Sequence, residues 1–134
     1  TIAGLCDDPS PIGPTILDRP HRTRYGLLAD GWDCNGGVWA ALGGLTAWTY
    51  ALHDPARAEA LLGRMSFAGQ RAAYPDVWYG QWSGPDARNS TMGDRAGETF
   101  VHPATPMTEF PVMNSNAHAG PLLGLVKLAQ TRRV

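Results

Sequence analysis

Apolar side chains recur at three- and four-residue steps around residue 45, which is the period of a helix with one buried face. The residues in this pattern are Val38, Leu42, Leu45, Trp48 or Thr49, and Leu52. The pattern predicts a helix over about residues 37–52, with these side chains facing the core. Gly43 and Gly44 in its middle weaken the helix by about 1 kcal/mol each relative to Ala, yet they let another helix approach closely.

A second helix is predicted over about residues 55–72. Asp54 provides a carboxylate at the N-cap position, and Pro55 occupies the first helical position, where proline is favoured. The apolar stripe of this helix consists of Ala58, Leu61, Leu62, Met65 and Ala68. Because only a short turn separates it from the first helix, we expect the two to form an antiparallel helical hairpin.

One more helix is expected after Asn116, running to about Thr131 with Pro121 in its first turn. Its apolar residues are Leu122, Leu123, Leu125, Val126 and Leu128. Residues 9–25, by contrast, contain four prolines, each of which fixes its own φ angle and disfavours helix in the preceding residue. We therefore interpret this segment as an extended connector.

Length and charge exclude several classes of protein. A chain of 134 residues with 43% apolar side chains suits one domain over residues 1–134 and is short for two. The formal charge of −1 leaves no basic surplus that would recruit nucleic acid. No apolar stretch approaches the length of a membrane span, and the N-terminus lacks the pattern of a signal peptide. We expect a soluble, cytoplasmic, all-α protein with no nucleic-acid or membrane partner.

Cysteine and histidine usage gives little support to a metal site. Cys6 and Cys34 are the only two cysteines, too few for a disulfide framework or a cysteine-rich zinc site. The four histidines, His21, His53, His102 and His118, share no metal-ligand spacing. We expect neither a metal nor another cofactor.

Residues 74–116 form the long connection between the second and third helices. This segment contains five prolines and no sustained helix or strand period, and a loop of such length in a compact domain is commonly functional. It also holds the aromatic and acidic side chains Trp78, Tyr79, Trp82 and Asp86. Sugar rings stack on aromatic faces, and carboxylates bind sugar hydroxyls, so this mixture is typical of a carbohydrate site. The alternative is a loop anchored by buried tryptophans.

A second cluster, residues 30–39, precedes the first predicted helix and contains Trp32 and Asp33. Its alternative interpretation is a turn with capping residues. Glycoside cleavage requires two carboxyl groups, one that donates a proton and one that activates water or attacks carbon. The candidate carboxylates are Asp33, Asp76, Asp86, Glu98 and Glu109. Each of them could instead be a solvated or ion-paired surface group.

Five segments carry a resemblance to a known family. They are DGWDCNGGVWAALGGLTAW (30–48), DPARAEALLGRMS (54–66), YPDVWYGQWSGPDARNS (74–90), AGETF (96–100) and TEFPVMNSNAHAGPLLGLVKLA (108–129). Together they resemble the C-terminal hairpins of six-hairpin toroid carbohydrate enzymes, nearest to glycoside hydrolase family 94 and its cellobiose-phosphorylase-like relatives. The resemblance covers about residues 9–129, and the aromatic segment is its most specific part.

The resemblance implies part of an (α/α)6 toroid that cleaves glycosidic bonds of oligosaccharides with phosphate or water as acceptor. It implies substrate contacts from Trp78, Tyr79, Trp82 and Asp86, with Trp32 and Asp33 at the neighbouring rim. Glu98 and Asp86 are the candidate catalytic carboxylates, Glu98 as a base near the reacting centre.

A toroid needs about twelve helices, well over twice this length. The chain therefore resembles the last third of a catalytic domain, and the family's general acid, on an earlier hairpin, has no matching position. We expect this piece to be inactive alone and to associate with the remainder of the toroid or with another copy of itself. The alternative is a non-catalytic carbohydrate-binding or structural helical module.

Overall fold

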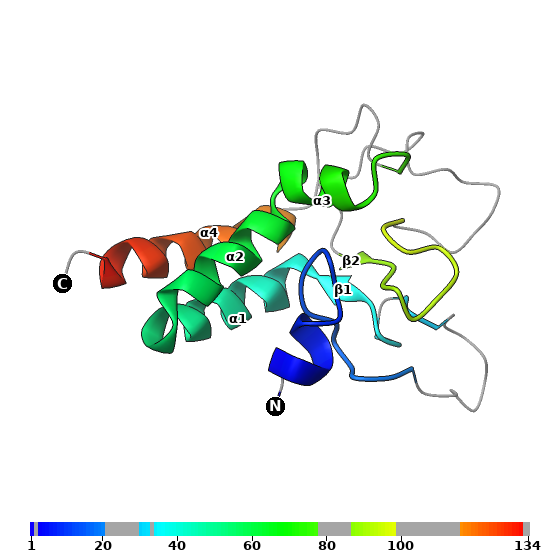
Figure 1. Ribbon diagram of the computed structural model, residues 1–134, viewed down its shortest axis with the longest axis horizontal. Coiled ribbons are helices and arrows are strands. Elements are labelled where there is room, and N and C mark those ends of the chain that lie inside the picture. The colour runs from blue at the N-terminus through cyan, green and yellow to red at the C-terminus, as the bar shows by residue number, and fades with distance from the viewer. Residues whose placement is uncertain (2, 21–29, 33, 78–86, 99–115, 133–134) are drawn as a thin grey trace.

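The computed structural model describes residues 1, 3–20, 30–32, 34–77, 87–98 and 116–132 (Figure 1). Its elements in chain order are η1 (Ala3–Asp7), β1 (Val38–Trp39), α1 (Ala40–His53), α2 (Pro55–Met65), α3 (Phe67–Ala73), β2 (Ala87–Arg88) and α4 (Asn116–Thr131). This part of the chain is helix-rich, as expected for an all-α protein. Strands β1 and β2 form a short antiparallel pair.

Helix α1 ends, and helix α2 begins, close to the predicted positions. Asp54 alone separates them, and its side-chain carboxylate accepts a hydrogen bond of 3.0 Å from the backbone N–H of Arg57. This cap and Pro55 at the first helical position confirm the predicted start of α2. Helix α1 starts later than predicted because Val38 and Trp39 pair with β2 instead.

The prediction of one continuous helix over residues 55–72 is wrong. Ser66 adopts an extended conformation, with φ −65° and ψ 157°, which ends α2 at Met65. The Ser66 side chain then accepts a hydrogen bond of 3.0 Å from the backbone N–H of Gly69 and caps α3. Gln70 fixes the bend, since its buried side chain donates to the Met65 carbonyl at 2.7 Å.

Helices α1 and α4 touch through glycines, as Gly43 and Gly44 suggested. A Cβ atom added to Gly44 would lie 1.9 Å from the carbonyl carbon of Gly120, so only glycine allows this backbone contact. A Cβ on Gly124 would lie 3.0 Å from the Ala47 Cβ and 3.1 Å from Leu62, closer than ordinary van der Waals contact. The helices α1, α2 and α4 consequently lie against one another as one layer (Figure 1).

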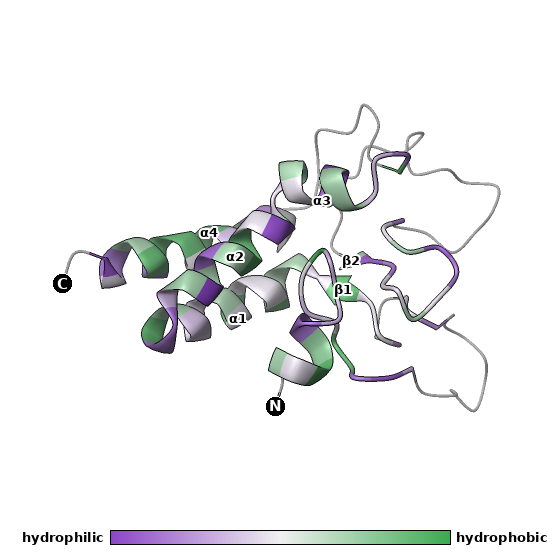
Figure 2. Ribbon diagram, viewed as in Figure 1, coloured by the Kyte–Doolittle hydropathy of each residue, from purple (hydrophilic) through white to green (hydrophobic). Residues whose placement is uncertain are grey.

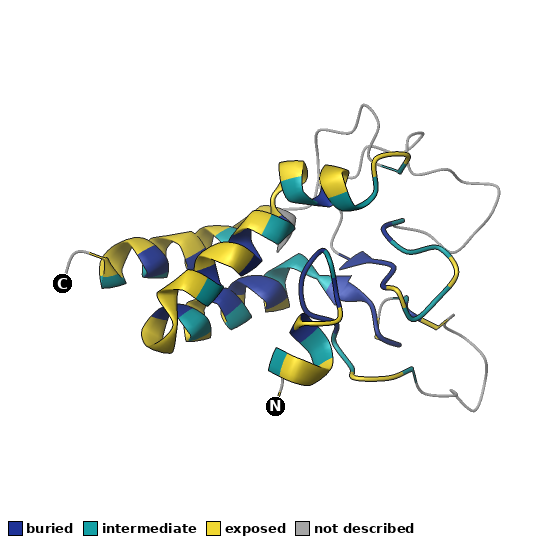
Figure 3. Cartoon of the chain, in the orientation of Figure 1, coloured by how far each residue is buried: buried dark blue, intermediate teal, exposed yellow. Residues whose placement is uncertain are grey.

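The predicted apolar stripe of α2 is confirmed at Ala58, Leu61, Leu62 and Met65, which are all buried. The predicted buried face is wrong for α1 and for most of α4. The buried apolar cluster consists of Ala47, Ala51, Ala58, Leu61, Leu62, Met65 and Leu128. The large residues of the sequence pattern lie outside instead, namely Leu42, Leu45, Trp48, Leu52, Leu122, Leu123, Leu125 and Val126. Glycine and alanine lie where α1 contacts its neighbours, because larger side chains would not fit there. Figure 3 shows buried positions where the three helices meet and exposed positions on their outer sides.

The N-terminal segment packs across the layer rather than serving only as an extended connector. Residues 8–20 form turns and bends, with an isolated antiparallel bridge between Thr15 and Val38. Ile12 is buried, and a Cβ on Gly13 would contact Met65 at 3.1 Å. The short π-helix η1 before this segment has no counterpart in the sequence prediction.

No helix within the described ranges combines the length and apolar character needed to cross a bilayer.

Candidate functional site

The β1–β2 pair brings together two loops that are about sixty residues apart in the sequence. Val38 pairs with Arg88, and Trp39 pairs with Ala87. Residues 30–37 lead into β1, and residues 89–98 follow β2, so the pairing places both loops at the same end of the helical layer (Figure 1). These two loops carry Trp32, a predicted substrate contact, and Glu98, a predicted catalytic carboxylate.

Backbone hydrogen bonds join the two loops directly. The Ser90 N–H donates to the Gly31 carbonyl at 2.8 Å, and the Gly31 N–H donates to the Asn35 carbonyl at 2.9 Å. Gly31 has a φ of 79°, and a Cβ there would lie 2.7 Å from the backbone nitrogen of Gly93. Only glycine tolerates both this conformation and this contact, so Gly31 sets how closely the loop bearing Trp32 approaches its neighbour.

Glu98 is held by its backbone and by an ion pair. The Asn89 N–H donates to the Glu98 carbonyl at 2.6 Å, and the Gly97 N–H donates back to the Asn89 carbonyl at 2.8 Å. The half-buried Glu98 carboxylate pairs with the Arg95 guanidinium. The alternative interpretation of Glu98 as an ion-paired group is therefore observed, and any catalytic role must operate with Arg95 beside it.

Polar side chains form the buried interior between the loops. Asn35, Arg88, Asn89 and Ser90 are each at most 5% exposed. The Asn35 amide donates to the Asp30 carboxylate at 3.2 Å. Burial lowers the pKa of the Arg88 guanidinium to about 8, because a buried environment disfavours the charged form. Buried amide, hydroxyl and guanidinium groups are thus concentrated in β2 and in the two loops that carry Trp32 and Glu98.

The sequence analysis missed this polar interior. None of Arg88, Asn89 and Ser90 was predicted as a site residue. Arg88 lies in β2, and Asn89 and Ser90 follow it directly. Only the pairing of β2 with β1, just before α1, brings these residues to the site. That pairing is not visible in the sequence, since β1 and β2 have only two residues each.

Of the predicted site residues other than Glu98, the structure describes Trp32 and Asp76. Trp32 is half-buried in its loop, whereas Asp76 is exposed in the turn after α3. The other predicted residues lie outside the described ranges, namely Asp33, Trp78, Tyr79, Trp82, Asp86 and Glu109. In the described part of the chain, no three His, Cys, Asp or Glu residues cluster as a metal site would require.

Comparison of the chain with known proteins gave no match to a family model, to a curated protein or to a solved structure. The resemblance to glycoside hydrolase family 94 therefore stays a prediction from the sequence. A functional proposal must rest on the chemistry of the two joined loops.

Proposed function

We propose that this chain forms part of a carbohydrate-active enzyme that cleaves glycosidic bonds of oligosaccharides by phosphorolysis or hydrolysis. The observation that carries the proposal is the joining of the Trp32 loop to the Glu98 loop over buried polar side chains. Indole rings pack on the apolar C–H faces of sugars, while carboxylate and amide groups bind hydroxyls. Both kinds of group lie on adjoining loops in this fold.

Each residue has a distinct proposed role. Trp32 stacks on a sugar at the rim of the site, and the Glu98 carboxylate accepts a proton from the attacking group. The predicted contacts Trp78, Tyr79, Trp82 and Asp86 belong to the segment that leads directly into β2, and Asp33 follows Trp32 in the sequence. We propose that these residues contribute to the same site as Trp32 and Glu98.

The uncovered apolar surface of the helices supports the proposal of a larger toroid. Leu45 is 53% exposed on α1, and Leu122 is 60% exposed on α4. Helices α2 and α4 also leave an apolar groove of about 420 Å³ between them, lined in part by Leu62 and Pro121. Exposed apolar patches of this kind mark surfaces that other elements cover. We propose further helical hairpins of an (α/α)6 toroid as that cover.

A non-catalytic carbohydrate-binding module is the second candidate. Cleavage needs two carboxyl groups about 5–10 Å apart across the sugar. In the described loops Glu98 is engaged with Arg95, and Asp30 and Asp94 are exposed. A site with stacking and hydrogen-bonding groups but one functional carboxylate would bind sugar without cleaving it.

The test is a calorimetric titration of the chain with α- and β-linked glucose oligosaccharides, with and without inorganic phosphate. We expect Trp32→Ala to weaken binding at least tenfold, because stacking and hydrogen bonds at such sites contribute about 1–3 kcal/mol. Trp48→Ala is the matched control, since Trp48 lies on the outer face of α1 next to Lys127. Equal effects of the two substitutions, or no binding by the unaltered chain, would contradict the proposal.

Glu98→Gln separates the two candidates. If Glu98 acts as a base, the substitution leaves sugar binding within about threefold but lowers turnover in an active, longer protein at least a hundredfold, the scale of general base catalysis. Unchanged turnover would favour the binding module.

A further inference from the structure

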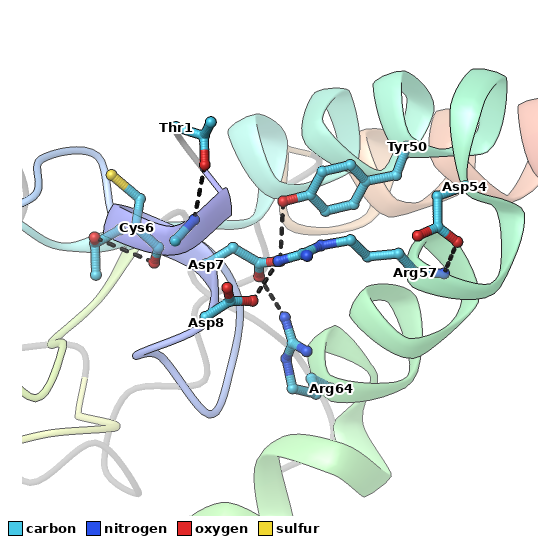
Figure 4. A network of polar contacts seen from close by, with 10 residues as sticks. Thr1, Cys6, Asp7, Asp8, Tyr50, Asp54, Arg57 and Arg64 are labelled. Carbon is cyan, nitrogen blue, oxygen red and sulfur yellow. Dashed lines mark hydrogen bonds and ion pairs between the residues drawn. The ribbon is translucent and has the colours of Figure 1, made fainter.

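A buried carboxylate anchors the N-terminal segment to the helices, away from the two loops (Figure 4). Asp7, the last residue of η1, is 1% exposed. Its carboxylate accepts hydrogen bonds from Arg64, from the Tyr50 hydroxyl at 3.1 Å and from Arg57 at 3.5 Å. Three donors from α1 and α2 therefore converge on one side chain of the N-terminal segment.

The neighbouring Asp8 provides an internal comparison. Its side chain is 58% exposed and pairs only with Arg57 among the described residues. Water screens an exposed ion pair and leaves it with little influence, whereas a buried carboxylate depends on its partners for compensation of its charge. Asp7, rather than Asp8, therefore determines where the N-terminal segment attaches.

Residues 6–16, which we call the N-terminal strap, connect Asp7 to the candidate site. The backbone N–H of Thr15 donates to the Cys6 carbonyl at 3.1 Å, which closes the strap on itself beside Asp7. Thr15 then bridges Val38, and the Ile16 N–H donates to the Gly37 carbonyl at 2.9 Å. The strap thus lies along β1, at the base of the loop that carries Trp32.

We propose that Asp7 is a positioning residue for the candidate site. By holding the strap on α1 and α2, it presses residues 15 and 16 against the start of β1 and fixes the loop of residues 30–37. The effect on sugar binding rests on the proposed function, whereas the effect on the strap does not.

Hydrogen exchange of individual amides tests the strap, with Asp7→Asn compared with Asp8→Asn in the full chain. We expect Asp7→Asn to accelerate exchange of the Ile16 amide at least tenfold while amides of α4 change less than threefold. Asp8→Asn should change both less than threefold. Because a general loss of stability accelerates all slowly exchanging amides together, a selective effect on Ile16 identifies positioning.

Tyr50→Phe is the milder variant for the case that Asp7→Asn does not fold. It removes one donor to Asp7 and keeps the ring on which Arg57 lies, 4.9 Å from the ring centre. We expect a smaller but still selective acceleration at Ile16, about threefold. Equal acceleration at Ile16 and in α4, or an unchanged Ile16 amide, would overturn the proposal.

Oligosaccharide titration completes the test. If the unaltered chain binds sugar, Asp7→Asn should weaken binding at least threefold and Asp8→Asn should not. Selective exchange at Ile16 with unaltered sugar affinity would overturn the link to the site. If the unaltered chain binds no sugar, the proposed function fails, while the exchange data still decide whether Asp7 positions the strap.

Discussion

The helical layer of α1, α2 and α4 and the loop region of residues 6–16, 30–37 and 87–98 bury different kinds of side chain. Alanine, leucine and methionine fill the layer, and its helices meet at Gly44 and Gly120. In the loop region the buried residues include Asp7, Asn35, Arg88 and Asn89. Figure 2 shows apolar residues interspersed with hydrophilic ones along the helices, and hydrophilic segments around β2.

The difference indicates two ways of specifying a structure. Close packing of complementary surfaces stabilises the contact between the helices, and it leaves no room for an added methyl group. Hydrogen bonds hold the loops, because a buried polar group without a partner destabilises the fold. Extra volume should therefore damage the helical layer most, and loss of a polar group should damage the loops most.

The largest effect is expected from Gly44→Ala. The new Cβ would lie 1.9 Å from the carbonyl carbon of Gly120, and neither backbone can move without separating α1 from α4. Overpacking usually destabilises by 1–3 kcal/mol, and a backbone clash exceeds ordinary overpacking, so we expect a loss of about 3 kcal/mol or more in urea unfolding.

Gly63→Ala is the matched control within α2. A Cβ at Gly63 has no neighbour within 4 Å, so only helix propensity changes. The substitution should stabilise the chain by about 0.5–1 kcal/mol. Similar losses from both substitutions would show that glycine does not act through the contact between α1 and α4.

Asn35→Ala tests the loop region. It removes a 2% exposed amide that donates to Asp30, and we expect a loss of about 1–3 kcal/mol in the free energy of unfolding. The control is Thr49→Ala, which removes an exposed hydroxyl that donates to the Leu45 carbonyl at 3.1 Å. That change should stay within about 0.5 kcal/mol. If Asn35→Ala lowers the free energy of unfolding no more than Thr49→Ala does, buried polar groups do not stabilise the loop region more than exposed ones.

The same contrast explains which parts of the fold could be predicted from the sequence. The start of α2 depends on a local signal, Asp54 before Pro55. The bounds of α4 were also predicted, but Pro121 lies inside this helix and not in its first turn as expected. The break at Ser66 was missed because a serine within an apolar period is usually tolerated. The prediction of which α1 side chains are buried was wrong, because the buried face of α1 is set by its contact with the glycines of α4. The apolar pattern of one helix contains no information about the helix that packs against it.

Long-range pairing limited prediction of the site in the same way. Trp32 and Glu98 were selected by residue type and family resemblance, and their loops do adjoin. The polar interior around Asn35 and Ser90 was not foreseen, because it forms only when two-residue strands far apart in the sequence pair. The anchoring of Asp7 by α1 and α2 depends likewise on tertiary contacts.

Alkaline pH gives a smaller test of the polar contacts. Burial and the Asp7 carboxylate raise the pKa of the Tyr50 hydroxyl above its ordinary value of about 10. The folded state then keeps this proton to higher pH than the unfolded state, so the contribution of Tyr50 to stability should fall as the pH rises above about 10. In Tyr50→Phe we expect a weaker fall, together with a loss of about 0.5–1.5 kcal/mol near pH 8, because the hydrogen bond is removed.

Urea unfolding between pH 8 and 11 provides the measurement. Burial also raises the pKa of Tyr74, so some alkaline destabilisation should persist in Tyr50→Phe. Tyr74→Phe, compared at the same pH values, isolates that contribution. An identical pH dependence of the free energy of unfolding in Tyr50→Phe and the unaltered chain would show that burial and Asp7 do not raise the pKa of Tyr50.

The smallest effect on folding is expected on the outer face of the helical layer. Leu45 is 53% exposed, so Leu45→Glu should change the free energy of unfolding by no more than about 0.5 kcal/mol. If this face normally packs against further helices, the isolated chain should self-associate through it, and the new charge should suppress that association. Sedimentation velocity over a range of concentrations measures the change.

Ala60→Glu adds the same charge at an exposed position of α2 and should leave association unaltered. Association that responds equally to both charges would reflect net charge rather than the apolar face. A strictly monomeric, sharply cooperative chain would mean that the large apolar residues of α1 and α4 need no cover. The helical layer would then be complete with its small-residue core alone, and the proposal of a larger toroid would lose its structural support.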